Sequence, residues 1–262
     1  LSAPPLGVFL VLRRLSLTGD AMAHAILPGA AVGFLVAGLS LPAMTLGGLA
    51  AGLVVALLAG AVARSTILKE DASLAAFYLV SLALGVLLVS LKGSNVDLMH
   101  VLFGTVLALD DAAIVLLATI ATVSLLALVA IWRGLVLECV DPEFLGSVSG
   151  AGAVVHGLFL VLVVLSLVAV FQALGTLMAV GLMILPAATA RFWTRQLGPM
   201  VLVAVAVALA SSLVGLLVSF HAGLPSGPAI ILTAGLAYVV SLLIGPVGSM
   251  ASGLRRATHL EA

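Results

Sequence analysis

The chain consists of long apolar segments separated by short polar ones. The apolar runs continue for about 20 residues at a time, which is the length that an α-helix needs to cross a hydrocarbon core roughly 30 Å thick. Apolar and polar positions do not alternate within them, so the pattern favours helices over the strands of a membrane barrel. The predicted spanning helices cover residues 16–39, 43–63, 73–91, 112–132, 153–171, 174–192, 200–220 and 229–247.

A shorter apolar run at 6–12 precedes these segments and ends at Arg13 and Arg14. At a rise of about 1.5 Å per residue it cannot span a membrane alone, and we interpret it as the end of a first helix whose beginning is missing. The sequence therefore predicts an all-α polytopic membrane protein with about eight to nine transmembrane helices, the first apparently truncated. Residues 1–262 are expected to form a single integral membrane domain.

Composition agrees with this class, because 64% of the residues are apolar and only 8% are charged, far from the balance of a soluble domain. The single cysteine, Cys139, excludes a disulfide within the chain. The sequence has no phosphate-binding GxxxxGK[ST] motif, no GxSxG motif and no HExxH motif. We therefore expect a transport conduit rather than an enzyme, and no nucleic-acid partner.

The basic residues indicate how the chain is oriented. If Arg13 and Arg14 are cytoplasmic and the helices alternate, nine of the ten lysines and arginines lie inside and only Lys92 lies outside, as the positive-inside rule favours. The polar segment at about 138–152 is then cytoplasmic, whereas the loops around Asp97 and His221 face out. His156, one turn into the following helix, is expected at the cytoplasmic interface in a structural role.

The segment GDAMAHAILPG places Asp20 and His24 within an apolar helix. Ionisable residues at membrane depth are costly and usually functional, and residues four apart share one helix face, with Cβ atoms roughly 5–6 Å apart. The pair could carry a metal ion or a proton, or it could only hold helices together, and the spacing favours neither. Pro28 cannot donate to the carbonyl four residues earlier, so it predicts a kink, as does Pro186 in a later helix.

Two further patterns are weaker. Asp97 and His100 lie three residues apart beside the expected outer mouth and could collect cations, although an ordinary solvated loop is the favoured interpretation. Small residues four apart, Gly29 with Gly33 and Gly48 with Gly52, predict a close contact between the helices at 16–39 and 43–63.

Five segments carry a resemblance to a known family: LRRLSLTGDAMAHAILPGAAVGFL, DLMHVLFG, DPEFLGSVSG, GLMILPAATARFW and LPSGPAIIL. In this order they are similar to the membrane permease subunits of bacterial zinc, manganese and iron ABC importers, which are fed by cluster A-I metal-binding proteins. The resemblance covers essentially the whole chain.

The resemblance implies a type II-like ABC importer permease in the bacterial plasma membrane, working as a homodimer surrounded by lipid. Its partners would be a cytosolic ATP-binding subunit and an extracytoplasmic metal-binding protein. Its substrate would be a divalent metal ion, with no permanently bound cofactor. Asp20 and His24 would line the translocation path. The segment that couples to the ATPase maps onto Asp141, Pro142, Glu143, Phe144, Leu145 and Gly146.

The main alternative is a secondary, proton-coupled carrier in which Asp20 and His24 form a proton relay. Such a carrier would not need a cytoplasmic segment that docks on an ATPase. A scaffold protein without transport activity is a third hypothesis, but it would not need a buried acid at mid-membrane. Carboxylate and imidazole suit zinc, manganese and iron alike, so the sequence does not identify the metal.

Overall fold

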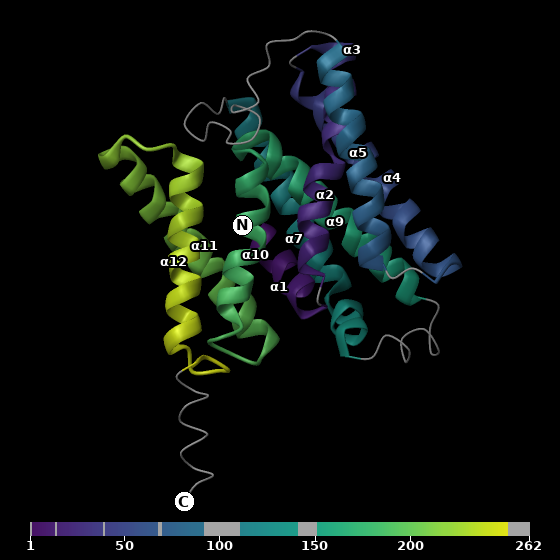
Figure 1. The fold of residues 1–262 in the computed structure, drawn as a ribbon. Helices are drawn as coiled ribbons and strands as arrows, with labels where there is room; N and C mark the ends of the chain where they lie inside the picture. The colour runs from purple at the N-terminus through teal and green to yellow at the C-terminus, as the bar shows by residue number, and fades with distance from the viewer. Residues whose placement is uncertain are drawn as a thin grey trace, which may run out of the picture.

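The computed structural model describes residues 2–13, 15–38, 40–67, 70–91, 111–140 and 151–250. These residues are almost entirely helical (Figure 1). The helices are α1 (Ala3–Leu12), α2 (Ser16–Ala25), α3 (Leu27–Ala37), α4 (Leu41–Ser65), α5 (Glu70–Leu91), α7 (Asp111–Val140), α9 (Ala151–Leu174), α10 (Thr176–Ala190), α11 (Leu197–Ala222) and α12 (Ser226–Ile244).

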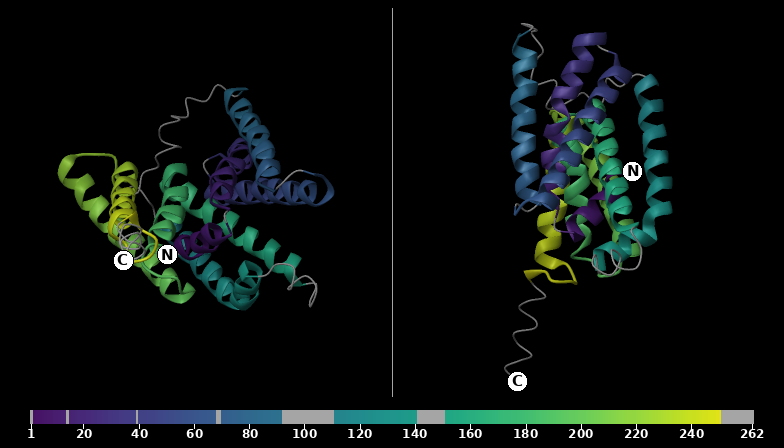
Figure 2. Two further views of the ribbon diagram at one scale, coloured as in Figure 1. Left: turned by 60° about the horizontal axis from the view of Figure 1, so that its bottom comes forward. Right: turned by 90° about the vertical axis from the view of Figure 1, so that its right-hand side faces the viewer.

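The longer helices surround a short central one. In both Figure 1 and Figure 2, α11 and α12 lie on one side of the molecule and α3, α4 and α5 on the other. Between them, α1 packs against α2, α9, α10 and α11. Every residue of α1 from Ala3 to Leu10 is buried, as expected for a helix that is apolar on all sides.

The expected count of eight to nine transmembrane helices is not supported. Among the described residues, six helical segments are long and apolar enough to cross a membrane: Leu17–Ala37, Pro42–Val62, Asp111–Val140, Val154–Phe171, Leu197–Ala222 and Ser226–Ile244. Three further apolar helices are shorter: Ala3–Leu12, Ala72–Leu88 and Leu177–Ala190. The prediction counted apolar segments, and hydropathy alone does not tell a full span from a shorter apolar helix buried among its neighbours.

The helix predicted over 16–39 is interrupted at one residue. Ile26 separates α2 from α3, and Pro28 lies in the first turn of α3, where its missing N–H group is tolerated. Ile26 itself keeps helical dihedral angles, so the interruption is confined to local hydrogen bonding. By contrast, α10 continues through Pro186 without a break, and a kink there stays a prediction.

The C-terminal boundary of α7 was predicted too early. The helix was expected over 112–132, but it runs to Val140. Glu138, which we assigned to a polar segment at 138–152, lies in the last turn of α7 and is only 7% exposed. A buried carboxylate can remain in a helix when groups from other elements satisfy it, which the local pattern does not show. The remaining coupling residues, 141–146, lie outside the described residues, as do Asp97 and His100.

Small residues bring α3 and α4 into backbone contact. A Cβ atom on Gly29 would lie 2.0 Å from the carbonyl oxygen of Gly47, and one on Gly33 would lie 2.5 Å from that of Ala43. The first predicted glycine pair therefore does form the contact. The second pair also faces the predicted helix at 16–39, because Cβ atoms on Gly48 and Gly52 would lie 2.7 and 3.3 Å from the side chain of Ile26. Gly47, which the sequence did not single out, makes the backbone contact with Gly29.

We expect Gly29→Ala to lower the free energy of unfolding by about 1–3 kcal/mol, because the added methyl group has no space against α4. The matched control is Gly235→Ala, since nothing lies within 4 Å of a Cβ atom there and alanine is the better helix former. Thermal unfolding of both variants in detergent provides the measurement. Equal melting temperatures would contradict the close approach of α3 and α4.

Candidate functional site

Asp20 and His24 lie on the same face of α2. His24 Nε2 is 3.7 Å from Asp20 Oδ1, which is an ion-pair distance but too long for a hydrogen bond. The Asp20 side chain is 54% exposed and that of His24 is 29% exposed. The two groups are therefore adjacent and only loosely bound to each other, and the carboxylate remains open at the surface of the single chain.

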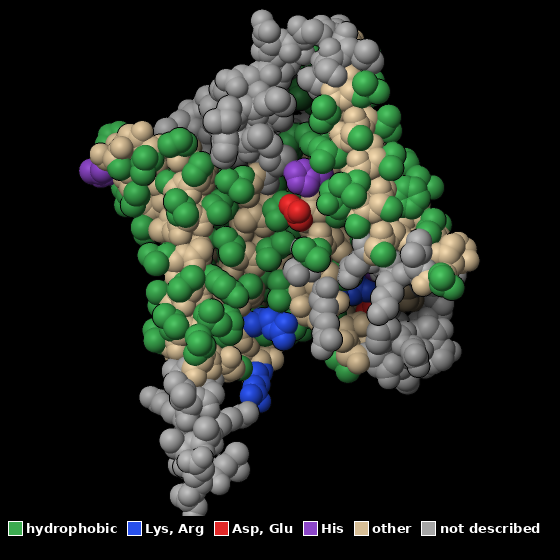
Figure 3. All heavy atoms as spheres, viewed as in Figure 1, with side chains coloured by type: hydrophobic (Ala, Val, Ile, Leu, Met, Phe, Trp, Pro, Cys, Tyr) green, Lys and Arg blue, Asp and Glu red, His purple; other side chains and the backbone are tan. Residues whose placement is uncertain are grey.

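The neighbouring helix α5 forms the other wall of this site. The ring of Tyr78 stacks on the imidazole of His24, with centroids 6.1 Å apart and planes inclined by 29°. A small pocket of about 140 Å³ lies beside the pair and is lined by Leu17, Thr18, Asp20, Ala21, Leu74, Ala75 and Tyr78. Figure 3 shows an acidic and a histidine side chain adjacent on this face, surrounded by hydrophobic side chains. Tyr78 was not identified from the sequence, because stacking across helices has no local signal.

Asp20 and His24 are the two potential cation ligands that this face of the chain brings together. Carboxylate oxygen and imidazole nitrogen suit divalent manganese, iron or zinc, but the described residues contain no group of three or more His, Cys, Asp or Glu side chains that could hold a metal. His24 Nδ1 is buried and has no hydrogen-bond partner among the described residues. Asp20 and His24 therefore offer two potential ligand atoms, fewer than the four that a protein-bound metal ion such as zinc usually takes.

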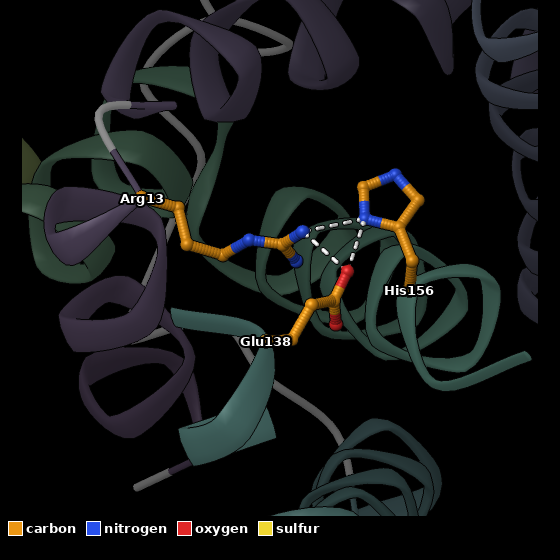
Figure 4. A network of polar contacts seen from close by, with 3 residues as sticks. All are labelled: Arg13, Glu138 and His156. Atoms are coloured by element: carbon orange, nitrogen blue, oxygen red, sulfur yellow. Dashed lines mark hydrogen bonds and ion pairs between the residues drawn. The ribbon is translucent and has the colours of Figure 1, made fainter. Parts of the chain in front are cut away.

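A second polar cluster lies inside the molecule, and the sequence did not predict it (Figure 4). Arg13 Nη2 donates to Glu138 Oε1 at 2.6 Å and approaches His156 Nδ1 at 2.8 Å. His156 Nδ1 lies 3.3 Å from the same Glu138 oxygen. The three side chains are between 8% and 17% exposed. They come from the end of α1, the end of α7 and the second turn of α9.

The hydrogen-bonding roles and the charges of these three side chains match one another. A guanidinium group can only donate hydrogen bonds, so His156 Nδ1 is the acceptor in its contact with Arg13. The positive and negative charges compensate each other, as buried ions require, and the guanidinium carbon also lies 5.5 Å from the ring centre of Phe159. The only sequence signals were an arginine that closes an apolar run and an acid and a histidine on either side of the segment 141–150.

Two other polar side chains, His221 and Arg191, make contacts with backbone carbonyl groups. His221 is exposed, and its Nδ1 contacts the carbonyl of Leu217 in its own helix at 2.8 Å. Arg191 lies at the same end of the molecule as Arg13, since its Nη1 donates to the carbonyl of Val11 at 3.4 Å. This shared end agrees with the predicted grouping of basic residues on one side.

Comparisons with known proteins agree with the resemblance in the sequence motifs. The sequence model of the ABC 3 transport family matches residues 1–245. The chain is 32% identical over 244 residues to the manganese import system permease protein ScaB of Streptococcus parasanguinis, covering 93% of this chain and 86% of that protein. It is 30% identical over 237 residues to a probable iron transport system membrane protein of Haemophilus influenzae, covering 90% and 86%.

A solved structure shares the fold. It is described as PsaBC from Streptococcus pneumoniae in complex with Fab, and one of its chains superimposes with a TM-score of 0.83 at 30% sequence identity. The match covers 94% of this chain and 88% of that chain.

We expect Asp20→Asn to change the free energy of unfolding by less than about 1 kcal/mol, because exposed ion pairs contribute little to stability. A pair that only holds helices together would instead make this variant markedly unstable. The measurement is thermal unfolding of Asp20→Asn and Gly29→Ala under the same conditions, which distinguishes the two roles of the pair. A loss as large as that of Gly29→Ala would favour the purely structural role.

Proposed function

Because the chain belongs to the ABC 3 transport family, we propose that Asp20 and His24 lie on the path of a divalent transition-metal ion. The chain is a permease subunit of a metal ABC importer in the bacterial plasma membrane. The relatives are manganese and iron permeases, so these two ions are the first candidates for the cargo. Nothing in these relatives supports a self-sufficient proton-coupled carrier.

The observation that carries this proposal is the exposed carboxylate within a membrane span. Asp20 belongs to the candidate span Leu17–Ala37, and its side chain is 54% exposed in the single chain. An ionisable group in a span faces protein or water rather than lipid, because a charge in hydrocarbon is costly. The surface around Asp20 must therefore be covered by protein or must line an aqueous path.

We assign this cover to a second copy of the chain. A dimer with twofold symmetry would place the same surface on both sides of one axis. Two aspartates and two histidines could then converge, which supplies four ligands for a transient ion. Lipid would surround the outer faces of the pair. The type II-like arrangement is part of the same proposal.

As an ABC permease, the chain acts in a complex with an ATPase and a substrate-binding protein. We propose that ATP hydrolysis belongs to the separate subunit and that this chain has no catalytic role. The ATPase contact is assigned to the segment of Asp141, Pro142, Glu143, Phe144, Leu145 and Gly146, with Phe144 as the buried anchor. The metal-binding protein would dock at the opposite end, where Asp97 and His100 are expected.

The test is uptake of radioactive manganese, iron and zinc by cells that lack the native importer and express each variant. We expect Asp20→Asn and His24→Ala each to abolish uptake while membrane levels and co-purification with the ATPase persist. Asparagine keeps the size of aspartate but removes the charge that attracts a cation. Asp111→Asn, the same change at an exposed position of α7, should leave uptake intact. Near-normal uptake by Asp20→Asn would contradict the proposed role.

A further inference from the structure

Arg13, Glu138 and His156 form a buried network at the ends of three helices, and the metal path does not use it. Glu138 precedes the connection at 141–150 and His156 follows it, whereas Arg13 closes α1. The guanidinium lies 2.6 Å from the carboxylate, so the place that a cation would take is already filled by a positive charge. The network is therefore not a second metal site.

Arg13 and Glu138 make only one of the two hydrogen bonds that their side chains could share. Only one oxygen of Glu138 and one terminal nitrogen of Arg13 take part. Glu138 Oε2 and Arg13 Nη1 are buried without a hydrogen-bond partner among the described residues. Arginine and carboxylate commonly form two parallel hydrogen bonds. A second, parallel hydrogen bond between the remaining nitrogen and oxygen would change how the two side chains face each other, so the network has a second arrangement available.

The network is also connected to the proposed metal path. Arg13 lies three residues before the start of α2, which carries Asp20 and His24. The helix before it, α1, is held tightly, since a Cβ atom on Gly7 would lie 1.8 Å from the carbonyl oxygen of Met183 in α10. Closely packed interiors transmit displacement rather than absorb it. A shift at the ends of α7 and α9 therefore reaches α2 through Arg13.

We propose that Arg13, Glu138 and His156 are positioning residues that couple the cytoplasmic ends of α7 and α9 to the helix bearing Asp20 and His24. This inference rests on the proposed function. The two arrangements of the ion pair correspond to two positions of α2 relative to α7 and α9. An ATPase that moves the chain between Val140 and Ala151 selects one of them. A two-state element biased from one end in this way is a physical basis for coupling between distant sites.

The test measures metal ions moved per ATP hydrolysed. The chain is reconstituted into lipid vesicles with its ATPase and metal-binding protein, and radioactive manganese uptake and ATP hydrolysis are followed in the same vesicles. We expect Glu138→Gln and His156→Leu to lower this ratio roughly tenfold, because the first removes the negative charge that compensates Arg13 and the second removes a buried acceptor of its hydrogen bond. His156→Asn keeps an acceptor near the position of Nδ1 and should restore most of the ratio. The control is Thr122→Val in α7, whose hydroxyl donates only within its own helix, to the carbonyl of Ala118.

The ratio separates coupling from folding. A variant that merely folds poorly loses uptake and hydrolysis together, so the ratio of the remaining protein stays at the wild-type value. Wild-type ratios in both Glu138→Gln and His156→Leu would overturn the proposed coupling. If wild-type vesicles hydrolyse ATP but take up no manganese, iron or zinc, the proposed function fails instead, and the two failures are distinct.

Discussion

The cost of placing charge in an apolar molecule governs the arrangement of this chain. With 8% charged residues in a chain that is 64% apolar, each ion within the helices needs a partner or a role. Arg13 and Glu138 satisfy this requirement inside one chain, where they compensate each other at 2.6 Å. Asp20 does not, because its nearest partner is 3.7 Å away and more than half of its side chain is exposed. One ion pair is compensated within the chain, whereas the other leaves a carboxylate exposed on its surface.

Close helix packing fixes the positions of the helices that carry these charged side chains. The glycines of α3 and α4 allow their backbones to touch, and α1 is buried along nearly its whole length. The interruption at Ile26 lies between these two tight regions, two residues after His24. Closely packed helices therefore flank Asp20 and His24 on both sides. The helix that carries the pair is interrupted just after it, at Ile26.

Much of this could be predicted from the sequence, because hydropathy and helix geometry are local properties. The apolar runs located the helices, and the spacing of four residues placed Asp20 and His24 on one face. The predicted number of spans is not supported by the described residues, because helix length and burial depend on neighbouring helices. Glu138 was misplaced, and its partnership with Arg13 was missed, because the two residues are 125 positions apart. Tyr78 was missed for the same reason.

Whether Asp20 and His24 bind the transported ion is tested most directly by electron spin-echo spectroscopy of manganese bound to the purified complex of permease and ATPase, without the metal-binding protein. Divalent manganese reports directly on nitrogen ligands through its coupling to their nuclei. We predict an imidazole nitrogen signal that disappears in His24→Ala and weakens when Asp20→Asn lowers the occupancy of the site by manganese. A nitrogen signal that persists unchanged in His24→Ala, or bound manganese with oxygen ligands alone, would contradict this prediction.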